Sequence, residues 1–330
     1  MARFTTVGRE IRGGYEWLTT RHRYLGRRGS PIRPASLLKQ VLGFTQRPSE
    51  EEGLVRLATI RTPHGTQATR LEGEDLVLLR SHDVGALLAE PDRDRASHDE
   101  TGESVPLATA QFATLVTRPT KTLWVGLNYR DHLLETGTPL PTYPTLFSKF
   151  TEALIGAHDD IVLPIVSDQV DWEVELCVVI GRVARHVPAA NALSVIAGYT
   201  VANDISVRDY QLRTHNSTQG KTFEDTTPVG PFLVTGDELG DALDLEVGCE
   251  VDGELLQHDR TSELVFSSAE LVSYCSDIVT LKPGDLISTG TPGGVGFTRQ
   301  PPRFLRPGQV VRTFIEGLGE CRNICANEAG

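Results

Sequence analysis

Apolar residues recur at alternating positions in short runs along much of the chain, which is typical of β-strands rather than long helices. Near the start this alternation covers residues 54–60, 66–71 and 76–79, and turn-forming residues separate the runs. Three short strands joined by tight turns predict a small β-meander. A short helix is expected at 83–90 with Asp83 as its N-cap, followed by a polar, acidic loop at 91–104.

The rest of the chain is also rich in strand patterns. The Asp252-Gly253 pair predicts a hairpin turn, and Ser267 with Glu270 has the spacing of a capping box at the start of a helix over 267–275. Further strands are expected at 123–126, 161–163, 174–180, 247–251, 254–257, 286–289 and 310–315. Helices are few and strands do not alternate with them, so we predict a strand-rich α+β fold, not a doubly wound one.

Length and composition suggest a division into three segments. A chain of 330 residues allows one large domain or two modest ones. We predict a basic N-terminal extension at 1–50, a small β-meander domain at 51–115 and a larger catalytic unit at 116–330. We interpret the extension as a solvated appendage; a docking arm for an acidic partner and a targeting peptide are the alternatives.

Charge and cysteine content exclude several classes of protein. Residues 1–50 carry ten Lys and Arg against three Glu, a charge of +7, which leaves −19 for the rest of a chain whose total is −12. So acidic a body argues against nucleic acid as a partner. No apolar run approaches the length of a membrane span, and no apolar N-terminal core indicates a secretory signal. Five scattered Cys form no disulfide framework, so we expect a cytoplasmic location.

Two carboxylates stand side by side at the start of the most apolar strand. Glu173 and Glu175 are two residues apart and therefore point to the same face of a strand. Like charges this close repel unless a cation lies between them, and oxygen ligands suit Mg²⁺ or Mn²⁺, with Ca²⁺ as a further option. Asp204, between apolar stretches, could add a third carboxylate, and Lys221 could balance their charge. A solvated strand edge is the alternative on local sequence alone.

Other polar groups form two further candidate features. His132 and Glu135 are one helical turn apart, so the carboxylate could orient the imidazole as a general base acting on water. A surface His–Glu pair is the alternative. The glycine-rich stretch 288–296 follows a strand and could cradle an anion with its backbone N–H groups, although it matches neither a phosphate loop nor a dinucleotide fingerprint.

Taken in order, five blocks of the chain resemble the fumarylacetoacetate hydrolase family. The resemblance extends over about 54–324 and is carried by GLNYRDHLLETG, DWEVELCVVIG, GYTVANDISVRDYQ, GKTF with PVGP, and LKPGDLISTGTPGGVG. It implies a mixed β-sheet roll with a small N-terminal domain, and a homodimer.

The resemblance also implies roles for individual residues. It implies that Mg²⁺ or Mn²⁺ is held by Glu173, Glu175 and Asp204, that Lys221 is the active-site lysine, and that His132 and Glu135 form a lid pair. It places Lys149, Arg208, Gln211 and Thr291 at substrate-binding positions. The chain departs from the family pattern at Glu224-Asp225 and in its basic first 50 residues.

Such a site suits chemistry on a small 2-oxo or dicarboxylic acid, because a cation stabilises the enolate that forms next to a keto group. Because the whole lid pair is present, we expect hydrolysis of a carboxylated 1,3-diketone such as an acylpyruvate. Decarboxylation of an oxaloacetate-like acid and isomerisation of 2-hydroxyhepta-2,4-diene-1,7-dioate are the alternatives. A non-catalytic metal-binding scaffold is a further alternative.

Overall fold

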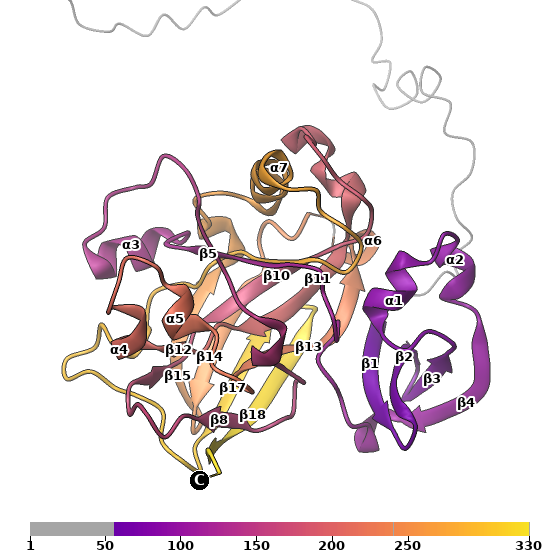
Figure 1. Cartoon of the computed structure of the whole chain (residues 1–330), viewed down its shortest axis with the longest axis horizontal. Helices are drawn as coiled ribbons and strands as arrows, with labels where there is room; N and C mark the ends of the chain where they lie inside the picture. Colours follow the sequence, from indigo (N-terminus) through magenta and orange to yellow (C-terminus); the bar gives the residue numbers. More distant parts are fainter. Residues whose placement is uncertain (1–55, 240, 330) are drawn as a thin grey trace, which may run out of the picture. The chain divides into compact units, whose positions relative to one another are not determined.

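The computed structural model describes residues 56–239 and 241–329. The expectations for residues 1–50 therefore lie outside the described residues. The described residues all belong to one compact unit, shown in Figure 1. Its strands and few short helices confirm the predicted strand-rich α+β class, with parallel and antiparallel pairs in the same sheets.

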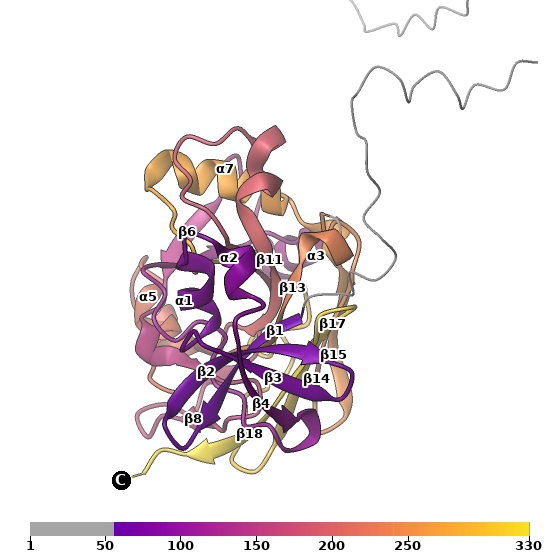
Figure 2. The same cartoon turned by 90° about the vertical axis from the view of Figure 1, so that its right-hand side faces the viewer.

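The largest sheet has 11 strands. Along it lie β4 (Glu100–Pro106), β3 (Asp75–Leu79), β2 (Gly65–Glu72), β1 (Arg56–Thr62), β13 (Thr227–Thr235), β11 (Ile196–Asn203), β10 (Val174–Ile180), β16 (Leu286–Ser288), β5 (Thr122–Gly126) and β6 (Thr145–Ser148), with β7 (Leu154–Ile155) paired to β13. Strand β1 pairs antiparallel with β13, so the predicted meander extends this sheet, and Figure 2 shows its strands side by side.

The remaining strands form two smaller sheets. One has five strands, β15 (Glu254–Arg260), β14 (Glu246–Val251), β17 (Val310–Ile315), β18 (Gly319–Asn327) and β8 (Ile161–Leu163), and the other pairs β12 (Ser206–Val207) with β9 (Val170–Asp171). The turn between β14 and β15 is Asp252-Gly253, as predicted, with positive φ of 54° and 81°.

The helices are short. They are α1 (Val84–Ala89), α2 (Arg93–Ala96), α3 (Arg130–Thr136), α4 (Arg208–Gln211), α5 (Thr218–Lys221), α6 (Gly236–Leu239) and α7 (Ser268–Ile278), with 3₁₀ turns at Leu107–Thr109, Thr151–Ala153, Ala189–Val195 and Thr261–Glu263. Asp83 caps α1, and Ser267 with Glu270 forms the predicted capping box of α7. No helix among the described residues is long and apolar enough to cross a membrane.

The prediction of a loop at 91–104 is wrong. Helix α2 and most of the strand β4 fall in this segment. Strand β4 lies at the end of the large sheet and pairs only with β3, so most of its side chains face solvent and are polar. Its composition is therefore that of a loop, although its backbone is held by its neighbour.

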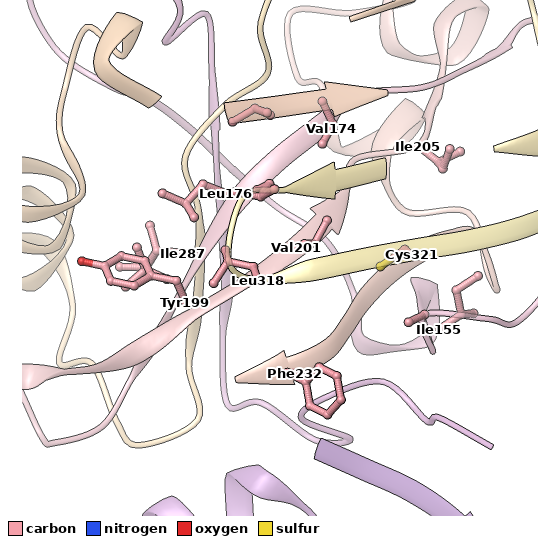
Figure 3. Close-up of a cluster of buried hydrophobic side chains, with 14 of the residues drawn as sticks. Ile155, Val174, Leu176, Tyr199, Val201, Ile205, Phe232, Ile287, Leu318 and Cys321 are labelled. Atoms are coloured by element: carbon pink, nitrogen blue, oxygen red, sulfur yellow. The ribbon is translucent and has the colours of Figure 1, made fainter. Parts of the chain in front are cut away.

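Two apolar clusters cover the two faces of the large sheet. Leu176, Val178 and Ile180 of β10 pack with residues of β14, β17 and β18 in one cluster, part of which is drawn in Figure 3. Cys177 and Val179, which alternate with them, belong to the second cluster, together with side chains of α1 and the meander. All five Cys are buried and free.

Candidate active site

Strand pairing brings the three predicted carboxylates together. Glu175 shares a face of β10 with Cys177, and its partner on β11 is Ala202, two residues before Asp204. Glu173 directly precedes β10, and its carbonyl accepts a hydrogen bond of 2.7 Å from the Asp204 amide. One carboxylate oxygen from each of the three residues lies within 4.8 Å of the others, and all three residues are buried.

Lys221 and Lys149 both contact this cluster, with different consequences. The Lys221 Nζ lies 2.6 Å from Glu173 Oε2 and 2.8 Å from Asp204 Oδ2. The Lys149 Nζ lies 2.7 Å from Asp204 Oδ1, 2.6 Å from Thr227 Oγ1 and 3.0 Å from the Ile205 carbonyl. Lys149 makes two hydrogen bonds and an ion pair, all with groups of the protein, whereas the two carboxylates leave one of the three N–H donors of Lys221 free. Lys149 is thus placed to hold Asp204.

Arg208 lies at the centre of a buried ion-pair network. Its Nη1 is 2.6 Å from Glu173 Oε1 and 2.9 Å from Gln211 Oε1. Its Nε and Nη2 lie 2.8 and 2.7 Å from Asp171 Oδ2. The predicted pair of Arg208 and Gln211 therefore reaches the carboxylate cluster. The sequence analysis did not select Asp171; its only local signal was an acidic side chain at the start of a buried strand.

The glycine-rich stretch does cradle anions with its backbone amides, but the anions are carboxylates of the protein itself. The amide of Gly290 donates to Glu175 at 2.9 Å, that of Gly296 to Asp171 at 2.7 Å, and that of Gly294 to Glu135 at 3.2 Å. Gly290 has a φ of 99°, and a Cβ there would lie 2.8 Å from the Asn128 Cβ. The stretch thereby joins the candidate metal ligands to the predicted lid.

The predicted pair of His132 and Glu135 is formed on α3. The Nδ1 atom of His132 lies 3.2 Å from Glu135 Oε2, and the Thr298 hydroxyl also donates to Glu135. The imidazole is buried, and its Nε2 has no hydrogen-bond partner among the described residues. A carboxylate on Nδ1 favours the tautomer that leaves Nε2 free to accept a proton.

The charges in the cluster shift its pKa values in opposite directions. Burial raises the pKa of Glu173, but the nearby charges of Lys221, Arg208 and His132 outweigh it and lower the pKa to about 2. Burial, together with Asp204 and Glu173, raises the pKa of Glu175 well above its usual range. The charge on Glu175 therefore remains poorly compensated by the protein.

The predicted substrate-binding Thr291 is held by a residue that the sequence analysis missed. The Nε2 of Gln257 donates to Thr291 Oγ1 at 2.8 Å and to the Pro292 carbonyl at 2.9 Å, while its Oε1 accepts from the Val174 amide at 3.0 Å. Gln257 lies on β15, far from both partners in sequence, and no local pattern identifies it.

The three carboxylates fit a hard divalent cation. Glu175 uses Oε2 for the Ser288 hydroxyl and the Gly290 amide, whereas its Oε1 accepts no hydrogen bond from the described residues. An all-oxygen donor set in which the Glu175 charge is poorly compensated suits Mg²⁺ or Mn²⁺. Glu173, Glu175 and Asp204 would hold the ion, which agrees with the predicted divalent-metal site; the identity of the metal is a proposal.

A family profile described as "Fumarylacetoacetate (FAA) hydrolase C-terminal" matches residues 121–325. The chain is 46% identical over 218 residues to "Oxaloacetate tautomerase FAHD2A, mitochondrial" from Homo sapiens, covering 65% of this chain and 69% of that protein. The chain therefore belongs to the fumarylacetoacetate hydrolase family and is an enzyme of that superfamily, as the resemblance of its motifs predicted.

Solved structures agree with this membership. A 2-hydroxyhepta-2,4-diene-1,7-dioate isomerase from Mycobacterium marinum has a TM-score of 0.70 and 34% identity, covering 84% of this chain and all of the other. A fumarylacetoacetate hydrolase from Exiguobacterium antarcticum has a TM-score of 0.71 and 27% identity, covering 83% of this chain and all of the other. Solved proteins with this fold are thus named both as isomerases and as hydrolases.

The comparisons correct the expected cytoplasmic location, which is wrong: similar proteins from human and cattle are named as mitochondrial. Cysteine content argues against an oxidising compartment, in which disulfides form, but it does not distinguish one reducing compartment from another. The departure at Glu224-Asp225 lies outside the buried cluster, since both side chains are exposed and the Asp225 amide donates to the Glu152 carbonyl at 3.0 Å.

Proposed function

We propose that this protein catalyses metal-assisted proton transfer on a small 2-oxo dicarboxylic acid, namely the keto–enol tautomerisation of oxaloacetate. The observation that carries the proposal is geometric: Lys221 contacts two of the three carboxylates and keeps a spare donor, and the glycine-rich stretch that binds Glu175 also binds Glu135, which holds His132 with its Nε2 free. The relatives named oxaloacetate tautomerase and the solved isomerase support this reaction over the diketone hydrolysis expected from sequence.

In the proposed reaction the free Nε2 of His132 takes a proton from the carbon next to the keto group. The electron pair of that C–H bond forms the carbon–carbon double bond of the enol, the former keto oxygen takes a proton from water, and His132 returns its own proton to water. The spare N–H of Lys221 stabilises the negative charge on that oxygen as it develops. When bound, Mg²⁺ or Mn²⁺ supplies further positive charge for the same purpose. Glu135 orients the imidazole throughout.

The test follows the enol and keto forms of oxaloacetate by ultraviolet absorbance, with the full chain and added Mg²⁺ or Mn²⁺. His132→Ala should slow tautomerisation about 10²–10⁴-fold, the usual contribution of a positioned general base. Lys221→Met should also slow it, whereas Lys282→Met, at an exposed lysine, should not.

Two parallel assays decide between reactions. Pyruvate release from oxaloacetate reports decarboxylation, and loss of acetylpyruvate absorbance reports hydrolysis. If either reaction is faster than tautomerisation in the unmodified enzyme, or if His132→Ala leaves tautomerisation unchanged, the proposed function is wrong.

We also propose that the protein is a homodimer and, from the names of its relatives, that it is mitochondrial. Light scattering coupled to gel filtration tests the first, where a monomer mass would contradict it. Cell fractionation tests the second, where recovery outside mitochondria would contradict it.

A further inference from the structure

A basic cavity lies next to the glycine-rich stretch and is separate from the carboxylate cluster. Its volume is about 470 Å³, and Arg299, Arg303 and Arg306 line it, together with Gln300, Pro301, Pro302 and Phe304. No Asp or Glu lines it. The chain beyond residue 50 carries a net charge of −19, the balance left by +7 in the first 50 residues and −12 in total, so this cavity reverses the prevailing charge.

The partners of the three arginines leave this positive charge largely uncompensated. Arg303 Nη1 pairs with Glu254 Oε2 at 2.6 Å. Arg306 makes one side-chain hydrogen bond, to the Asp168 carbonyl at 3.0 Å, and Arg299 binds the Leu256 and Gly294 carbonyls at 2.9 and 3.1 Å. Neither of these two has a carboxylate partner among the described residues.

Arg299 has, in addition, a buried donor with nothing to bind. Its Nε is shielded from solvent and makes no hydrogen bond in the described structure. A guanidinium has five N–H donors, and leaving a buried one unpaired is unfavourable. Because this Nε is shielded from solvent it does not face the cavity, and the donors open to a ligand are those that Arg303 and Arg306 leave unused beyond one polar side-chain contact each.

We propose that this cavity binds a small organic or inorganic anion that carries a carboxylate or a phosphate group. Guanidinium groups match both groups geometrically and bind them through paired N–H donors. Phe304 and the two prolines supply apolar contacts for a short carbon chain, as in a dicarboxylic acid.

The bound anion acts on the loop that holds the lid pair. Arg299 donates to the Gly294 carbonyl, and the Gly294 amide donates to Glu135. The Thr298 hydroxyl, one residue before Arg299, donates to the same carboxylate. An anion that orders the Arg299 side chain therefore also orders the groups that donate hydrogen bonds to Glu135.

Calorimetric titration of the metal-free full chain tests the site, with inorganic phosphate and succinate as separate probes at constant ionic strength. We expect saturable binding of at least one probe. The double variant Arg303→Gln/Arg306→Gln should weaken it about tenfold or more, because each change removes a charged donor. The control Arg182→Gln/Arg322→Gln removes two exposed arginines elsewhere and should leave binding unchanged. Circular dichroism confirms that each variant is folded.

The outcomes are distinct. Binding of phosphate alone identifies a phosphate ligand, and binding of succinate alone identifies a carboxylate ligand. Lys221→Met, altered in the carboxylate cluster, should retain binding. Equal binding by the cavity double variant, loss of binding in Lys221→Met, or no saturable binding of either probe overturns the proposal. Hydrogen exchange of the 294–298 amides should slow when the probe binds; unchanged exchange would refute the effect on the lid loop.

Discussion

Asp171→Asn tests whether the buried network around Arg208 holds the candidate active site together. In the structure Oδ1 of Asp171 accepts from the amides of Trp172 and Gly296, at 2.8 and 2.7 Å. Its Oδ2 accepts from Arg208 and from the Phe297 amide, the latter at 3.0 Å. Asparagine can keep the first pair of hydrogen bonds, but its NH₂ group would meet donors at the second position.

The size of the effect follows from what Arg208 loses. Removing one partner from a buried ion pair costs about 3–5 kcal/mol of unfolding free energy. Arg208 keeps Glu173, 2.6 Å away. Burial also raises the pKa of Asp171 despite Arg208, so its charge is itself partly unfavourable. Both facts place the expected loss of unfolding free energy at the lower end of this range, about 3 kcal/mol. Such a loss changes the unfolding equilibrium constant about a hundredfold.

Urea unfolding of the metal-free protein measures this change. Asp168→Asn is the matched control, since the same chemical change at an exposed position should stay within about 0.5 kcal/mol. In a double-mutant cycle, Arg208→Gln should lower the free energy of unfolding less in the Asp171→Asn variant than in the unmodified protein, because Asp171→Asn has already removed a partner of the Arg208 charge. A loss no larger than that of Asp168→Asn, or strictly additive costs, would refute the reasoning.

Three further predictions concern the metal, the lid and the N-terminal segment. Glu175→Gln should leave the metal-free protein at least as stable as the unmodified one, because burial and neighbouring carboxylates raise the pKa of Glu175. The same change should abolish the stabilisation by Mn²⁺ that a thermal-shift assay measures. Full stabilisation by Mn²⁺ would contradict the metal site. Burial raises the pKa of Glu135, but hydrogen bonds from His132, Thr298 and Gly294 leave it below its usual value. The stability that Glu135 contributes is therefore present above its unfolded pKa of about 4.3 and is lost as the pH falls through its lower folded pKa. The difference in melting temperature between the unmodified protein and Glu135→Gln should therefore shrink in acid. A difference that does not change with pH would contradict this prediction. Deleting residues 1–50 should leave turnover intact, since every candidate site residue lies beyond residue 130, and a loss of folding or activity on assay of 51–330 would contradict this.

The sequence was sufficient wherever a structural feature depends on neighbours a few residues apart. The apolar run of β10 predicted a buried strand, and the two-residue period put Glu173 and Glu175 on one side of it. The capping box of Ser267 and Glu270 is equally local. The motif order then identified the family, and with it the grouping of residues that are remote in sequence.

Features that arise from pairing between remote segments needed the tertiary structure. Polar β4 is a strand because β3 lies beside it. Lys149 is held by Asp204, Thr227 and Ile205, which lie 55 or more residues further along the chain. The family resemblance implied a substrate-binding position for Lys149, and only the tertiary structure shows which groups of the protein its ammonium contacts.

The same holds for Asp171, Arg208 and Gln257. Each is buried, and most of its partners belong to segments that are remote in sequence. A polar side chain in a sequence carries no sign of whether folding will bury it, because the free energy of burial depends on partners supplied by other strands. The chemical groups of this protein could therefore be selected from its sequence, but which of them remain free for a substrate was decided by tertiary packing.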